Sequence, residues 1–119
     1  MRICSTSENK QSEKRIAIIP EIAKKYINVG FEVSLIENYG LHLGYDDNQF
    51  KELGVNIIKD EKELISNSDI IIQLGLLSDD KISLIKENQI LIGVFNSYKN
   101  KEKILIFFFD KFLILSLLL

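Results

Sequence analysis

The sequence contains one cysteine, one proline, one histidine and no tryptophan. The single cysteine, Cys4, cannot form an internal disulfide, which excludes a disulfide-stabilised secreted domain. One histidine and one cysteine do not supply a set of soft ligands for a metal site, so no metal is expected. Residues 1–8 lack the apolar stretch of a secretory signal, and the sequence therefore predicts a cytoplasmic protein.

Glycine is scarce, and its spacing excludes several motifs. The six glycines stand at positions 30, 40, 44, 54, 75 and 93, and none forms the G-x-G pair of a dinucleotide-binding loop. A P-loop and the G-x-S-x-G nucleophile motif are also absent. The net charge of -2 is spread without long blocks of one sign, which gives no basis for binding nucleic acid.

One long apolar run is present, at residues 104–119. It is interrupted by Asp110 and Lys111 and is shorter than the roughly 20 residues that a membrane-spanning helix needs. It follows neither the helical nor the strand periodicity. We therefore expect a domain at residues 1–103 and an aberrant apolar tail at 104–119. Two origins of the tail stay open: a shift of reading frame near residue 104, or a genuine segment that forms a buried C-terminal helix.

The rest of the chain has the length of one domain and a regular pattern. Short β-rich apolar runs alternate with amphipathic stretches up to about residue 96, which predicts βα units around a parallel sheet. The predicted strands are 2–4, 31–36, 55–58, 69–74 and 89–95. We expect an α/β fold of three layers with a mainly parallel sheet of about five strands, a Rossmann/flavodoxin-like half domain.

Four helices are predicted from their ends and their apolar spacing. The first spans 20–29, because Pro20 suits a first helical turn and Gly30 suits a helix end. The second stops at Gly54, the third carries Leu64 and Ile65, and the fourth carries Ile82 and Ile85. The expected N-caps of these three helices are Asp46, Asp60 and Ser78. The acidic pairs 46–47 and 79–80 are interpreted as residues of helix starts, where carboxylates stabilise the first turn.

Arg15 is the one candidate site residue. It precedes the apolar segment 16–19 and the helix start at Pro20, a position where a ligand can meet a guanidinium and backbone amides together. An intact one-domain enzyme would need a base close by, and Glu8 and Glu13 are the local candidates. His42 lies between two glycines and is interpreted as a solvent-facing loop residue.

Several of these residues together resemble a known family. The pattern R-x-A-x-x-P-E at Arg15–Glu21, followed by Gly-x-Glu-Val and an early glycine loop, is similar to the N-terminal domain of the alanine dehydrogenase and NAD(P) transhydrogenase alpha-subunit family. The resemblance covers about residues 1–103. Within the family, the segment 91–100 makes the resemblance closer to the transhydrogenase alpha subunit. The matching residues are Glu8, Lys14–Glu21, Gly30–Val33, Glu37, Gly40, Gly44–Asp46, Phe50, Gly54–Val55 and Ser68–Ile71.

The resemblance implies a role in passing hydride between NAD(H) and NADP(H), coupled to proton translocation. It implies NAD and NADP as cofactors of the parent family, and the transhydrogenase beta subunit and the remaining alpha-subunit domains as partners, with a homodimer as a further expectation. No nucleic acid and no direct membrane span are expected. The implied location is cytoplasmic, peripheral to an inner-membrane complex.

This chain also departs from the family pattern. Residues 4–8 read Cys-Ser-Thr-Ser-Glu in place of the usual Gly-Val-Pro-Lys-Glu, and Leu77 replaces a proline. Alanine dehydrogenases are expected to have lysines where this chain has Gln73 and Gly75, and a histidine where it has residues 96–98. Without a lysine to hold a keto acid or a histidine to carry a proton, alanine dehydrogenase activity is not expected.

Of the family's substrate contacts, only Arg15 stands on a matching position. The resemblance also implies that the NAD-binding Rossmann domain of the family lies downstream of these residues. The fragment by itself is expected to bind no NAD or NADP and to be inactive, because hydride transfer needs both halves of the cleft. The alternative is a non-catalytic interaction module that pairs with a separately encoded Rossmann domain.

Overall fold

The computed structural model describes residues 1–75 and 77–93 with their side chains, and the strands at 104–109 and 112–117. The elements follow one another in alternation, as the sequence predicts. They are β1 (Arg2–Ser5), α1 (Pro20–Asn28), β2 (Glu32–Ile36), the short 3-10 helix η1 (Leu41–Leu43), α2 (Asp47–Glu52), β3 (Asn56–Ile58), α3 (Glu61–Ser66), β4 (Ile70–Gln73), α4 (Asp79–Ile82), β5 (Ile90–Gly93), β6 (Ile104–Phe109) and β7 (Phe112–Leu117).

The strands form one sheet in the order β3-β2-β1-β4-β5-β7-β6. The first five strands are all parallel, which confirms the predicted α/β class and its parallel sheet. The chain builds outward from β1 to β2 and β3, then returns to the other side of β1 with β4 and β5. The order of the first five strands matches strands 3-2-1-4-5 of a doubly wound Rossmann sheet. The direction in which successive strands are added to the sheet reverses between β1 and β4.

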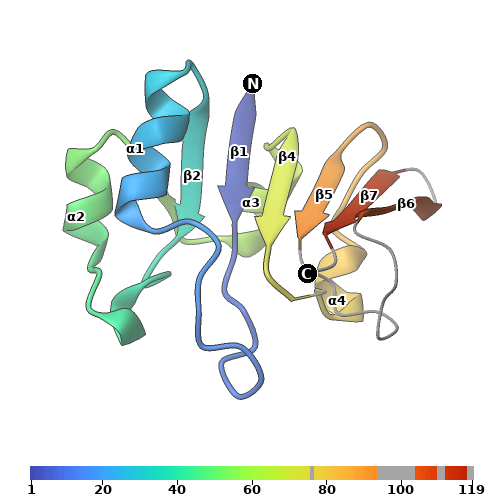
Figure 1. Cartoon of the computed structure of the whole chain (residues 1–119), viewed down its shortest axis with the longest axis horizontal. Coiled ribbons are helices and arrows are strands. Elements are labelled where there is room, and N and C mark those ends of the chain that lie inside the picture. Colours follow the sequence, from blue (N-terminus) through green and yellow to red (C-terminus); the bar gives the residue numbers. More distant parts are fainter. Residues whose placement is uncertain (76, 94–103, 110–111, 118–119) are drawn as a thin grey trace.

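Helices cover both faces of the sheet, which confirms the three predicted layers (Figure 1). Alternate residues of each strand point to opposite faces, so Ile3 and Cys4 belong to two different cores. Under α1 and α2 the buried side chains include Ala23, Val33 and Phe50. Under α3 and α4 they are Cys4, Leu64, Ile65, Ile71, Leu77, Ile85 and Leu91.

The ends of the first two helices follow from single residues. Pro20 is the first residue of α1, as predicted. Gly30 and Gly54 follow α1 and α2 with φ of 103° and 99°, a region that favours glycine. At α1 the amides of Gly30 and Phe31 bond back to Ile27 and Tyr26, and the same pattern ends α2. The loop conformation therefore satisfies the last carbonyls of both helices.

The capping predictions are correct at two of three positions. Asp46 accepts a bond from the Gln49 amide and forms a full capping box, and Asp60 accepts from the Lys62 amide. Ser78 is the N-cap residue of α4, but its side chain makes no capping bond, so that part of the prediction is wrong. The helix is also shorter than predicted, because α4 ends at Ile82 and Ile85 lies beyond it.

The C-terminal segment does not form the buried helix that the sequence analysis kept as one alternative. Residues 104–109 and 112–117 are strands, with β7 parallel to β5 and β6 antiparallel to β7. The alternative of a buried C-terminal helix is therefore wrong. The boundary at residue 103 stays a prediction, and residues 94–95, the predicted end of β5, lie outside the described residues. In the part of the chain that the structure describes, no helix is long and apolar enough to cross a membrane.

The two cap positions give a matched pair of variants. Asp46→Ala removes a side-chain bond to a helix amide and should lower the free energy of unfolding by about 1 kcal/mol. Ser78→Ala removes no such bond and should change it by less than about 0.5 kcal/mol. Urea denaturation followed by circular dichroism measures both. Equal losses in the two variants would contradict the capping geometry.

Candidate functional site

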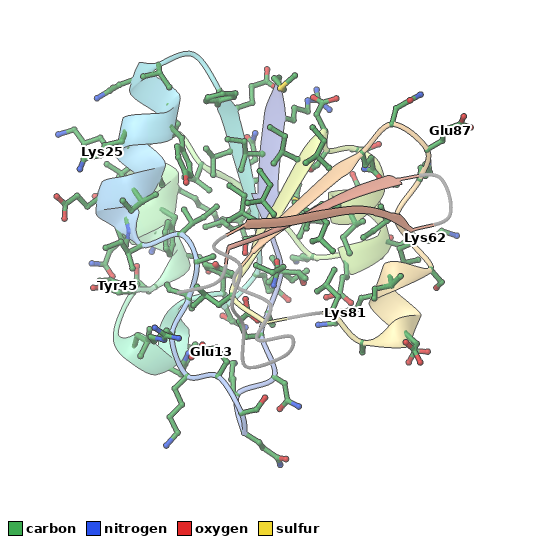
Figure 2. The ribbon with its side chains drawn as sticks, turned by 45° about the vertical axis from the view of Figure 1, so that its right-hand side comes forward. Glu13, Lys25, Tyr45, Lys62, Lys81 and Glu87 are labelled. Atoms are coloured by element: carbon green, nitrogen blue, oxygen red, sulfur yellow. The ribbon has the colours of Figure 1, made fainter. Side chains whose placement is uncertain are left out.

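The candidate site lies at the carboxyl ends of β1 and β4, where the strand order reverses. In open α/β sheets, ligands bind at this position because the loops after the two strands part to opposite faces. The loop after β1, residues 6–19, extends beyond this edge of the sheet (Figure 1). Figure 2 shows Glu13 on this loop and Lys81 on α4 at the same end of the molecule.

Gln73, the last residue of β4, joins the two strand ends. Its Oε1 accepts a bond of 2.7 Å from the Thr6 amide, and its Nε2 donates to the Thr6 carbonyl at 3.0 Å. The side-chain amide thus pairs with Thr6 as another peptide group would in a sheet. Gln73 is only 1% exposed, so water cannot replace these bonds. The loop after β1 therefore starts from a fixed point.

Ser5 and Tyr39 extend this network to the other side of β1. The Tyr39 hydroxyl accepts bonds from the amides of Ala17 and Ile18, at 3.0 and 3.1 Å. Its own proton is then free for Ser5 Oγ at 2.9 Å, and Ser5 donates in turn to the Ile72 carbonyl at 2.6 Å. Burial raises the pKa of Tyr39 to about 12, so the hydroxyl stays protonated near neutral pH.

Thr6 and Lys81 connect the same edge to α3 and α4. The Thr6 hydroxyl donates to Glu61 at the start of α3, and Lys81 Nζ lies 3.2 Å from the same carboxylate. Lys81 also donates to the Ser7 carbonyl at 3.0 Å. Its charge is therefore balanced by Glu61, and both side chains hold the start of the loop against the helices.

Glu8 binds the end of β4 with its carboxylate. Its Oε2 accepts from the Leu74 amide at 2.7 Å and from Gln73 Nε2 at 2.9 Å, and its Oε1 accepts from the Gly75 amide at 3.0 Å. Burial raises the pKa of Glu8, and the two amide bonds oppose that rise. Glu8 is therefore committed to the structure of the loop, and its position does not support the base that a one-domain enzyme would need.

Arg15, the predicted site residue, lies on the outer part of the loop. Its side chain is 75% exposed and forms two bonds with Glu13, from Nη2 to Oε1 at 2.7 Å and from Nε to Oε2 at 3.1 Å. The bond and charge of Arg15 hold the pKa of Glu13 below its usual value. Glu13 is therefore a carboxylate close to Arg15, but it is engaged as the ion-pair partner of Arg15. The role of Arg15 as a ligand contact stays a prediction.

Two further features complete the edge. His42 is exposed, as predicted, and its Nε2 lies 2.8 Å from the Lys14 carbonyl, which ties the η1 loop to the Arg15 loop. A pocket of roughly 250 Å³ lies between the loop after β1 and the start of α4, lined by Ser7, Glu8, Asn9, Leu77, Ser78 and Lys81. Among the described residues, no three side chains of the metal-binding types come together.

Sequence reasoning missed most of the residues that build this edge. Tyr39, Ser5 and Lys81 carried no signal, because each is an ordinary polar residue near a strand or helix end. Gln73 was singled out only as a replacement for a lysine. Thr6 could have given a signal. The family pattern has a proline at this position, whereas Thr6 has an amide that can bond to Gln73. Residues 96–98 lie outside the described residues.

Tyr39→Phe should lower the free energy of unfolding by about 2–4 kcal/mol, because it leaves the Ala17 and Ile18 amides without an acceptor while keeping the ring that packs on Phe50. Tyr26→Phe is the matched control, since its ring packs edge to face on Phe31 in the same way. Its expected loss is below about 0.5 kcal/mol. Urea denaturation gives both values, and faster amide exchange at residues 17 and 18 in the first variant alone locates the effect.

Known proteins are similar to this chain in sequence and in fold. The family model described as "Alanine dehydrogenase/PNT, N-terminal domain" matches residues 5–111. The first part of the NAD(P) transhydrogenase alpha subunit of Rickettsia prowazekii is 33% identical over 108 residues, and that match covers 87% of this chain and 28% of the relative. Alanine dehydrogenase 1 of Staphylococcus aureus is 26% identical over 102 residues and covers 86% of this chain and 27% of the relative.

Solved structures agree on the fold. The transhydrogenase from Sinorhizobium meliloti superposes with a TM-score of 0.76 at 22% identity, covering 84% of this chain and 30% of that protein. An L-alanine dehydrogenase gives a TM-score of 0.73 at 18% identity, covering 80% and 26%. This chain thus spans less than a third of the length of these relatives. Because the family model covers most of the chain, the protein belongs to the alanine dehydrogenase/PNT N-terminal domain family.

Proposed function

We propose that this chain forms the first domain of an NAD(P) transhydrogenase alpha subunit, which takes part in hydride transfer between NAD(H) and NADP(H). The observation that carries the proposal is the family match over residues 5–111, together with the 33% identity to the transhydrogenase alpha subunit of Rickettsia prowazekii. The partners in this proposal are the remaining alpha-subunit domains and the beta subunit, with the domain on the cytoplasmic side of the inner membrane.

The end of β4 supports transhydrogenase over alanine dehydrogenase. Gln73 is neutral, and its amide is already used by Thr6 and Glu8. At Gly75 even a Cβ atom would lie 3.3 Å from Glu8 Oε1, so a longer side chain there would press on the carboxylate. Position 73, where the resemblance implies the strand's own lysine, and position 75, where it implies the lysine that holds the keto acid, therefore both lack a positive charge.

In this proposal the domain forms one wall of the ligand-binding cleft, and Arg15 is the residue of this wall that moves to contact the ligand. The guanidinium is exposed and charged at every physiological pH, and its partner Glu13 belongs to the same loop. An anionic group of a bound ligand can take the place of Glu13, because an exposed ion pair contributes little stability. Nucleotide binding and the alignment of the two nicotinamide rings come from the other domains, so the 119 residues alone do not catalyse hydride transfer.

A domain exchange tests the transhydrogenase assignment. Residues 1–103 of this chain replace the matching segment of the Rickettsia prowazekii alpha subunit, and hydride transfer from NADPH to an NAD analogue is measured with the full set of subunits. We expect activity within about tenfold of the parent. Arg15→Ala in the exchanged domain should lower it further, whereas Lys14→Ala, a neighbouring exposed change, should not. A chimera that folds and assembles but transfers no hydride would contradict the assignment.

The isolated chain should bind neither NADH nor NADPH at sub-millimolar concentration in titration calorimetry. The physical reason is that a single wall of the cleft offers too few contacts to offset the entropy lost on binding. Alanine with NAD+ serves as a second titration, and it should also give no heat of binding. Saturable binding of NADH would mean that the nucleotide site lies within these residues, and the proposed division of labour would then be wrong.

A further inference from the structure

The backbone on both sides of Arg15 is held by one other segment of the chain, the connection between β2 and α2. The η1 helix lies in this connection, and the loop after β1 passes beside it (Figure 2). The contacts come from residues 39–42 of the connection, which we call the clamp. They reach residues 14, 16 and 17, so that Arg15 lies between held neighbours.

His42 of the clamp holds the residue before Arg15. Its Nε2 lies 2.8 Å from the carbonyl oxygen of Lys14. A carbonyl oxygen can only accept, so Nε2 is the donor in this bond. The ring carries a hydrogen at Nε2 both in the neutral tautomer that the bond selects and in the cation, so the contact does not depend on the charge of the ring. It fixes the peptide group that links Lys14 to Arg15.

Gly40 and Tyr39 hold the residues after Arg15. The side chain of Ile16 is buried, and a Cβ atom at Gly40 would lie 3.3 Å from its Cδ1, so the glycine allows the two segments to approach closely. The Tyr39 hydroxyl accepts from the amides of residues 17–18 at 3.0 and 3.1 Å. Because Tyr39 is only 1% exposed, its hydroxyl is itself held in place by the surrounding core.

The side chain of Arg15 is held far less firmly than its backbone. It is 75% exposed and bonds to Glu13, a neighbour on the same loop. An exposed ion pair of this kind contributes little stability, so another anion can replace Glu13 at small cost. Arg15 thus combines a backbone that is fixed on both sides with a guanidinium that can exchange partners.

We propose that Tyr39 and His42 are positioning residues for Arg15: they fix the backbone there, so that the guanidinium reaches an anionic group of a ligand by rotation of the side chain alone. The anionic ligand rests on the proposed function of the domain. The effect of Tyr39 and His42 on the backbone at Arg15 does not.

A fixed backbone favours ligand binding because less order has to be created at that moment. If residues 14–18 moved as a free loop, each residue that became ordered on contact with the ligand would weaken binding. The clamp orders these residues before the ligand arrives, and only the torsions of the Arg15 side chain remain to be fixed. Loss of one clamp contact should therefore weaken ligand binding even though the guanidinium is still present.

The first test measures backbone order in the whole isotope-labelled chain by NMR relaxation. In His42→Ala the amide order parameter at Arg15 should fall from about 0.85 to below about 0.6, whereas residues 17–18 stay ordered because Tyr39 still binds them. His42→Gln should keep the order, since its side-chain amide can also donate to a carbonyl. Leu41→Ala is the matched control at an exposed neighbour and should change nothing. An order parameter at Arg15 that His42→Ala leaves unchanged would overturn the proposal.

Global stability separates positioning from general support of the fold. His42 is exposed and its side chain makes one bond to the loop, so His42→Ala should shift the urea midpoint by less than about 0.5 M. A larger shift, with order lost well beyond the loop, would contradict a positioning role. Tyr39→Phe is the second variant, and it should lower order at residues 17–18 and at Arg15. If it does not fold, the His42 variants still decide.

The second test places the same changes in the exchanged domain of the transhydrogenase. His42→Ala should lower kcat/KM for the NAD analogue about fivefold, mainly through KM, because the guanidinium itself is kept. In the Arg15→Ala background the same change should have no further effect, and Leu41→Ala should have none in either background. An equal loss with and without Arg15 would overturn the proposal. If the exchanged domain supports no hydride transfer at all, the proposed function fails, and the order parameters still decide whether the clamp positions Arg15.

Discussion

The side-chain amide of Gln73 is the interaction on which the carboxyl edge of the sheet depends. At the switch point, β1 and β4 lie side by side, but their pairing ends at Cys4 and Ile71, so Thr6 in the loop that follows has no ladder partner on β4. Gln73 provides one by bonding to both the N–H and the carbonyl of Thr6, and its remaining N–H goes to Glu8. Because the group is buried, losing it would leave several polar atoms without partners at once.

Two departures from the family pattern depend on each other through this contact. A proline at position 6 would offer no N–H, whereas Thr6 has an N–H that needs an acceptor and a hydroxyl that reaches Glu61. Gln73 supplies the acceptor in place of a positive charge. The same substitution leaves Glu8 with neutral donors, so the carboxylate is held by hydrogen bonds and carries its desolvation cost without an adjacent lysine from β4.

Much of the fold could be predicted because its signals are local. The stop at Gly30 needs only a residue that adopts positive φ, and the start at Asp46 needs only a carboxylate one turn before its amide. The prediction at Ser78 was incorrect in its side-chain contact because a hydroxyl can turn away, and α4 is a single turn with little to hold it. The C-terminal segment was misjudged because a uniformly apolar run has no period, so that sequence alone cannot choose strand over helix.

The sequence by itself determined the alternation of strands and helices, the parallel sheet, and the prominence of Arg15 and Glu8, since each depends on residues close together in the chain. Only the tertiary structure decided which polar groups meet. Ser5 with Tyr39, Thr6 with Gln73 and Glu8 with Gly75 are separated by 34, 67 and 67 positions. Their contact arises because parallel strands bring their carboxyl ends to one edge, where buried donors and acceptors must be paired. No local pattern records that requirement, and for this reason the candidate site emerged from the fold and not from a motif.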